Sequence, residues 1–232
     1  MLLIGVSVFP VIVILVYIYF RDKYEKEPLT LLIKAFVAGV LSALATLLAL
    51  SLAAQVNLPG SSAFTGALIK AFVGAAIPEE LFKFAFLYLL IWNNRNFNEY
   101  YDGIVYAVFV SLGFACFENI LYVTDQGLTV GIMRALLAVP AHALFGVVMG
   151  YYLSVARFND TNTALNLGKS ISYAILLHGI YDFLIFLYVG TIGISDLLSV
   201  ILVIAFFAFV VGLWRAGLRK ISKHIKLSAA RE

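Results

Sequence analysis

The chain has 232 residues, of which 63% are hydrophobic and 12% are charged, and its mean hydropathy is +1.00. Soluble domains carry about 25% charged residues, so this chain cannot cover a globular surface with water-facing side chains. The composition excludes a soluble protein and indicates an integral membrane protein. The formal net charge of +3 is too small to indicate a nucleic-acid partner. The only cysteine, Cys116, excludes a disulfide within the chain.

Continuous apolar stretches predict an all-α, polytopic helical membrane protein with about seven transmembrane helices. Each stretch is near or above the ~20 residues that a helix needs to cross the hydrocarbon core. The third and fifth are long enough to tilt, or to kink at Pro78 and Pro140. We expect residues 1–232 to form a single membrane domain, with a catalytic-like core over residues 65–190. The predicted spans are residues 2–20, 31–53, 65–92, 104–123, 130–156, 171–189 and 196–214.

Basic residues alternate between the connections of these spans. The tail after residue 214 carries them, whereas the connections 54–64, 124–129 and 190–195 have no lysine or arginine. The positive-inside rule therefore predicts that the N-terminus is outside and the C-terminus is cytoplasmic. The first span lacks the features of a cleaved signal peptide, so we expect an uncleaved anchor. We expect the basic tail, residues 215–232, to be held by anionic lipid.

Ionisable side chains interrupt four consecutive spans. Glu79 and Glu80 lie near the centre of the third, where each acid costs about 2.5–3.5 kcal/mol on insertion scales. Lys83 lies one helical turn further on, between the two acids, and can neutralise one of them. His178 and Asp182 are i,i+4 neighbours on the sixth span. The candidate catalytic residues are Glu79, Glu80, Lys83, Glu118, His142, His178 and Asp182.

These groups are expected to meet in one hydrated pocket, because scattering them on lipid-facing surfaces would cost far more. Histidines and carboxylates can hold a metal such as zinc, and the candidate ligands here are Glu118, His142 and His178. They can also activate water without a metal, with Glu79 favoured as the general base and histidines stabilising the oxyanion. Both routes lead to hydrolysis of a carbonyl compound, for which a peptide bond is the expected substrate.

Two functions from other classes stay open at this point. Buried Glu, Lys, His and Asp side chains also form the proton relays of transporters, although the halves of this chain show no inverted repeat. A non-catalytic membrane sensor with a degenerate site is a third possibility. Among protease types, the zincin motif HExxH is absent. The Tyr101-Asp102 and Tyr181-Asp182 pairs fit an aspartyl protease poorly, because the GxGD element is missing.

Four short motifs carry a resemblance to a known family. Glu79-Glu80-x-x-Lys83, Phe117-Glu118-Asn119, His142 and His178-Gly-x-x-Asp182 follow one another on separate spans. In this order they resemble the PrsW family of intramembrane proteases and, more distantly, the superfamily of CAAX-prenyl proteases and Abi proteins. The resemblance covers about residues 75–185.

The resemblance implies a multi-pass protein of the cell membrane that cleaves a membrane-anchored protein, such as a single-span anti-sigma factor. Two departures separate the chain from the CAAX type. That type has an arginine one residue after the position of Lys83, and often an asparagine at the position of Asp182. PrsW proteins are described as metalloprotease-like, whereas CAAX proteases resemble metal-free glutamate proteases, so the metal question stays open.

Overall fold

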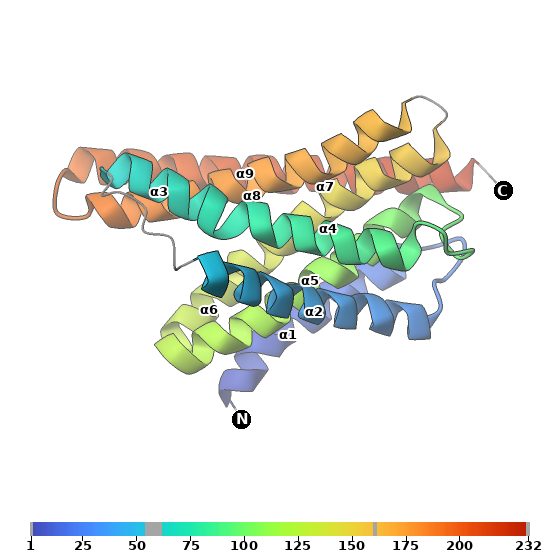
Figure 1. Cartoon of the computed structure of the whole chain (residues 1–232), viewed down its shortest axis with the longest axis horizontal. Coiled ribbons are helices and arrows are strands. Elements are labelled where there is room, and N and C mark those ends of the chain that lie inside the picture. The colour runs from blue at the N-terminus through green and yellow to red at the C-terminus, as the bar shows by residue number, and fades with distance from the viewer. Residues whose placement is uncertain (1, 54–61, 160–161, 231–232) are drawn as a thin grey trace.

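The computed structural model describes residues 2–53, 62–159 and 162–230. These residues form nine α-helices and one π-helical turn, and most of the long helices run along the longest axis of the molecule (Figure 1). The helices are α1 (Leu2–Arg21), α2 (Leu29–Ala53), α3 (Ala63–Ala71), η1 (Phe72–Ala76), α4 (Ile77–Ile91), α5 (Tyr100–Gln126), α6 (Leu128–Leu136), α7 (Ala138–Phe158), α8 (Thr163–Thr191) and α9 (Asp196–Ala229).

Every predicted span has a helical counterpart, and the all-α class is confirmed. The third predicted span is built from α3, η1 and α4, which follow one another without a break from Ala63 to Ile91. Within the described residues, six other helical segments are long and apolar enough to cross a membrane. They are Ile4–Arg21, Leu29–Leu52, Tyr100–Gln126, Leu128–Phe158, Thr163–Thr191 and Asp196–Ala229.

A π-helical turn lies directly before the two adjacent acids. In η1 the N–H of Ile77 bonds to the carbonyl of Phe72, five residues back. Pro78 follows at the second position of α4 and has no N–H to continue the ladder. Such turns occur often at functional sites, because the extra residue rotates the side chains that follow. The turn therefore helps to set the direction in which Glu79 and Glu80 leave α4.

The fifth predicted span is divided into α6 and α7 at Leu137, whose φ and ψ are −118° and −59°. The break lies three residues before Pro140, where the kink was predicted. Pro140 itself falls in the first turn of α7, where a missing N–H leaves no helical hydrogen bond unmade. As a result α6 is a short separate helix with its own direction (Figure 1).

Close approaches between backbones hold the centre of the bundle together. A Cβ on Gly113 of α5 would lie 2.0 Å from the carbonyl oxygen of Phe36 in α2. A Cβ on Gly150 of α7 would lie 2.1 Å from the carbonyl oxygen of Gly103 in α5, and Gly146 faces α5 in the same way. The small-residue pair Gly146 and Gly150 is therefore a packing face, as its spacing predicts.

The last helix extends well beyond the predicted span 196–214, to Ala229. His224 is buried, and its ring stacks on Tyr151 of α7 with centroids 4.1 Å apart. Ser228 accepts a hydrogen bond of 3.1 Å from the backbone N–H of Tyr101 at the start of α5. Most of the expected basic tail is thus a packed helix, on which Lys223 and Lys226 are exposed and Lys220 lies over the ring of Tyr151.

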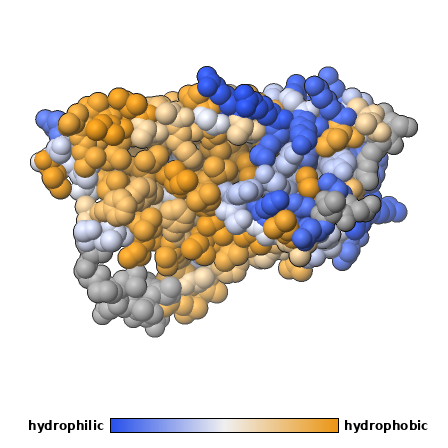
Figure 2. Space-filling view, turned by 90° about the horizontal axis from the view of Figure 1, so that it is seen from above, coloured by the Kyte–Doolittle hydropathy of each residue, from blue (hydrophilic) through white to orange (hydrophobic). Residues whose placement is uncertain are grey.

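The surface divides into an apolar part and a hydrophilic end. Figure 2 shows hydrophobic residues over most of the length and hydrophilic residues gathered at one end. The turns that join α1 to α2 and α4 to α5 lie at this end, together with the end of α7, the start of α8 and the end of α9 (Figure 1). This arrangement agrees with the alternation of basic connections along the sequence.

Candidate active site

The first turns of α4 place an ammonium between two buried acids. Lys83 Nζ lies 3.3 Å from Glu79 Oε2 and 2.7 Å from Glu80 Oε1. The i,i+4 and i,i+3 spacings produce this contact, so the predicted position of Lys83 is confirmed. The ammonium contacts both acids rather than one. It also lies 4.0 Å from the centroid of the Phe114 ring, a cation–π contact that stabilises a desolvated cation.

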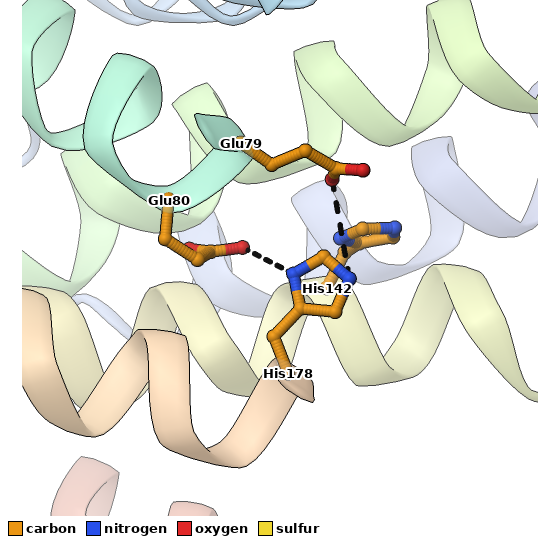
Figure 3. Close-up of side chains that lie close together, drawn as sticks. All are labelled: Glu79, Glu80, His142 and His178. Carbon is orange, nitrogen blue, oxygen red and sulfur yellow. Dashed lines mark hydrogen bonds and ion pairs between the residues drawn. The ribbon is translucent and has the colours of Figure 1, made fainter. Parts of the chain in front are cut away.

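His178 reaches from α8 toward both acids (Figure 3). Its Nδ1 lies 2.9 Å from Glu80 Oε1 and its Nε2 lies 4.0 Å from Glu79 Oε2. Nε2 also lies 3.3 Å from Asp182 Oδ2, which confirms the predicted i,i+4 pair. The ring of Phe145 stacks on the imidazole with centroids 4.9 Å apart. Carboxylates at both nitrogens and an aromatic ring on one face therefore fix the orientation of His178.

His142 of α7 connects the lysine to Glu118 of α5. Its Nδ1 lies 3.2 Å from Lys83 Nζ, and its Nε2 lies 3.1 Å from Glu118 Oε2. An ammonium can only donate, so Nδ1 must accept and Nε2 carries the proton that is donated to Glu118. The rings of His142 and His178 are 5.1 Å apart and nearly perpendicular.

Arg134 of α6 completes the far side of the site, and sequence reasoning missed it. Its Nη2 donates to Glu118 Oε2 at 2.7 Å, and its Nε donates to Asn119 Oδ1 at 3.2 Å. Its guanidinium carbon lies 3.9 Å from the centroid of the Tyr122 ring. The signal was present in the sequence, because Arg134 is a charged residue inside a predicted span, where a cation needs a partner.

A cavity of about 800 Å³ opens beside these groups. Glu79, Glu118, His142, His178 and Asp182 line it, together with apolar side chains of α2 and of α5 to α9. Glu80 and Lys83 are fully buried behind this wall. The structure therefore brings together all of the sequence-predicted candidates, while their catalytic roles stay predictions.

Four of the buried side chains could hold one metal ion. Each of Glu79, Glu80, His142 and His178 offers one ligand atom, and these atoms lie within 4.8 Å of one another. Two imidazoles and two carboxylates are donor types that zinc accepts, so the residues fit such an ion. Glu118 does not belong to this group of four, and its Oε2 contacts His142 and Arg134. Its role as a ligand stays a prediction.

A bundle of membrane-spanning helices that buries carboxylates and imidazoles beside a cavity has the architecture of an enzyme working inside the bilayer. Comparison with known proteins identifies the family. The sequence model described as "PrsW family intramembrane metalloprotease" matches residues 27–213. The chain therefore belongs to the PrsW family of intramembrane metalloproteases.

Similarity to curated proteins extends along almost the whole chain. The chain is similar to Protease PrsW of Geobacillus kaustophilus, with 36% identity over 227 residues, or 95% of this chain and 91% of that protein. For Protease PrsW of Bacillus subtilis the identity is 36% over 222 residues, or 95% and 94% of the two chains. For that of Clostridioides difficile it is 32% over 228 residues, or 96% and 91%. No solved structure shows a significant match.

Family membership confirms the resemblance read from the four motifs. The protein is an intramembrane peptidase and a multi-pass protein of the cell membrane. Its substrate is a protein, and its surroundings are lipid. The sequence also left open a transporter and a non-catalytic sensor. Membership of a protease family favours the protease over both of these alternatives.

Proposed function

We propose that the protein hydrolyses a peptide bond in or near the membrane span of an anchored protein, with Glu79 activating the attacking water. The observation that carries this assignment is the difference between the two adjacent acids. Glu79 lines the cavity, whereas Glu80 is 0% exposed and its Oε1 contacts both Lys83 and His178. A general base must come within hydrogen-bond reach of the water it activates, and Glu79 faces the space where that water can lie.

The neighbouring groups have separate roles in this proposal. Glu80 and Lys83 form a buried frame that holds Glu79 and the two histidines in place. Carboxylates at both nitrogens of His178 favour N–H donation from its ring. His178 is therefore placed to donate a hydrogen bond to the carbonyl oxygen of the scissile peptide, where negative charge develops. Asp182 holds the ring in this orientation.

We further propose a metal-bound form of the site, in which the metal of this family is zinc and one atom each of Glu79, Glu80, His142 and His178 would hold it. In this form Glu79 and His178 act as ligands, and their roles as base and donor belong to the metal-free form. Bound zinc would polarise the scissile carbonyl and make a coordinated water more acidic. Lys83 Nζ lies within 3.3 Å of Glu79, Glu80 and His142, so an ion and the ammonium compete for the same carboxylates. The metal content of the purified protein therefore shows whether these carboxylates bind an ion or the ammonium of Lys83.

The resemblance to PrsW proteins supports a single-span anti-sigma factor as the substrate. The test is cleavage of such a protein in liposomes by the purified wild-type protein and by His142→Ala, with the metal content of both preparations measured. We expect His142→Ala to lose zinc and cleavage together. Full cleavage by His142→Ala would contradict the proposed site. If His142→Ala loses cleavage although the wild-type protein contains no metal, the zinc assignment is contradicted. Solute uptake without cleavage of any candidate would favour a transporter.

We also propose that the N-terminus is outside, the C-terminus is cytoplasmic, and the lysines at the end of α9 bind anionic lipid. The hydrophilic end seen in Figure 2 supports this orientation. Ile194 and Ala230 are exposed near opposite ends of α9. In a Cys116→Ala background, an impermeant thiol reagent applied to cells should label Ile194→Cys and spare Ala230→Cys. The reverse pattern would overturn the orientation.

A further inference from the structure

We propose that Arg134 is a positioning residue of the active site, which holds Glu118 where Glu118 fixes the ring of His142. The inference rests on the proposed protease function. It concerns a residue on α6, a short helix that carries none of the four family motifs. Arg134 acts through Glu118 and His142: its guanidinium contacts Glu118, Asn119 and Tyr122 rather than the acid pair on α4.

One carboxylate oxygen connects the three residues. Glu118 Oε2 accepts from Arg134 Nη2 at 2.7 Å and from His142 Nε2 at 3.1 Å. A carboxylate oxygen has two lone pairs, so both donors can be satisfied at once. The side chains of Arg134 and Glu118 are 17% and 21% exposed, so the pair lies at the cavity wall and is largely shielded from solvent. Shielding strengthens a charge-assisted hydrogen bond.

The guanidinium is itself held at three points, which makes it a rigid support. Besides its contact with Glu118, Nε donates to Asn119 Oδ1 at 3.2 Å, and the planar group stacks on the ring of Tyr122. Asn119 in turn donates to the backbone oxygen of Ser7 in α1 at 3.3 Å. A planar fork that stacks and donates in two directions is a property of arginine that lysine lacks.

Loss of this support would release Glu118. Lys83 is another cation of the site, but it is already bound by Glu79 and Glu80. Glu118 could then rotate into the cavity and leave the Nε2 of His142 without its acceptor. The His142 ring would be free to turn, and the contact between its Nδ1 and Lys83 Nζ would be weakened. A residue that orients a site side chain in this way typically contributes about 10- to 100-fold in activity.

The kinetic test compares Arg134→Gln, Arg134→Lys, Glu118→Gln and the double variant Arg134→Gln/Glu118→Gln on a single-span substrate that the wild type cleaves. We expect Arg134→Gln to lower kcat about 10- to 100-fold while KM changes less than about threefold. Arg134→Gln and Glu118→Gln both disrupt the same contact between Arg134 and Glu118. The double variant should therefore be no slower than the slower single variant. Arg134→Lys should recover part of the loss, since it keeps the charge but not the fork.

The matched control is Arg157→Gln. The guanidinium of Arg157 also lies over an aromatic ring, 5.6 Å from the centroid of Trp92, but it does not line the cavity. Its kcat should stay within about twofold of the wild type. Wild-type kcat in Arg134→Gln, an effect confined to KM, or losses that multiply in the double variant would each overturn the proposal.

A spectroscopic readout separates failure of this inference from failure of the proposed function. In protein with ¹⁵N-labelled histidine, the His142 signal is assigned by its loss in His142→Ala. Arg134→Gln should shift that signal, while the His224 signal stays in place. A shift without any cleavage by the wild type would overturn the protease proposal and keep the positioning role. An unchanged His142 signal in a folded Arg134→Gln would overturn the positioning role.

Discussion

Two groups of buried acids stand out in the part of the chain that the structure describes, and one of the two has the surroundings of an active site. The second group, which we call the end cluster, consists of Asp22, Glu27 and Asp102 at the hydrophilic end of the bundle. Glu27 accepts the hydroxyl hydrogen of Tyr106. Asp102 accepts the N–H of Asn98 at 2.9 Å and that of Glu99 at 2.6 Å, which caps α5.

The two groups differ in their partners and in access. The acids of the active site contact lysine, arginine or histidine side chains, and three of them line the cavity. In the end cluster Glu27 accepts from the Tyr106 hydroxyl and Asp102 accepts from backbone N–H groups. The side chains of Glu27 and Asp102 also interact with each other, and none of the three acids lines the cavity. Burial raises the pKa of Glu27 to about 7 and that of Asp22 to about 6. A perturbed acid therefore marks an active site only together with cationic or imidazole partners and an open space.

The largest expected effect is the difference in cleavage rate between two variants, in each of which one acid of one group is replaced by its amide. Glu79→Gln should lower the cleavage rate about 10²- to 10⁴-fold, because an amide cannot accept the proton of the attacking water. Glu27→Gln should stay within about twofold of the wild type, because it keeps an acceptor for Tyr106. The measurement is single-span substrate cleavage in liposomes.

Glu80→Gln provides the internal control for this exchange, because it sits beside Glu79 but is closed off from the cavity. We expect it to differ from Glu79→Gln in the size of its effect. Full activity in both variants would remove the acid pair from the mechanism, and an inactive but folded Glu27→Gln would extend the functional region to the end cluster.

The second largest effect concerns stability. Lys83→Met should destabilise the protein by about 3–5 kcal/mol, because it leaves two buried carboxylates without their cation. The thermal midpoint in detergent is the measurement, and Lys23→Met, in the exposed connection between α1 and α2, is the control. The double variant Glu80→Gln/Lys83→Met should regain part of the loss. If Lys83→Met is as stable as the wild type, Glu79 and Glu80 are not both charged in the folded protein.

The sequence was sufficient for the fold class and for the members of the site other than Arg134. Apolar length predicts membrane helices because the bilayer demands about 20 residues, and charges inside such lengths stand out. The i,i+3 and i,i+4 spacings of Lys83 then predict its contacts without knowledge of other helices. The pair of His178 and Asp182 follows from the same geometry.

The remaining features depend on packing between distant segments. Pro78 and Pro140 predict distortions of their spans, but they do not predict that the first is a π-helical turn over Phe72–Ala76 or that the second is a break at Leu137. Phe145 looks like an ordinary lipid or core residue until its ring is seen on His178. His224 lies within residues 215–232, for which the sequence predicts only a basic tail at anionic lipid. The buried face that this segment presents to α5 and α7 follows from the structure alone.

The smallest effect is a pH dependence of stability that the end cluster produces. The pKa of Glu27 rises from 4.5 to about 7 on folding, because burial disfavours its charged form. Between these values the folded protein holds a proton that the unfolded chain has released. Stability is therefore greatest below the ordinary pKa and falls as the pH rises toward 7. Asp22 contributes in the same direction, from 3.8 to about 6.

Glu27→Gln should remove this contribution, so its thermal midpoint in detergent should fall less than that of the wild type between pH 5 and pH 8. Glu25→Gln is the matched control, because Glu25 is exposed and lies in the same connection. It should keep the wild-type slope. If both variants show equal slopes, the proton is held elsewhere, and the end cluster would stabilise the helix ends through hydrogen bonds alone. In either case cleavage by Glu27→Gln at pH 7 should match the wild type, because the end cluster has no access to the cavity.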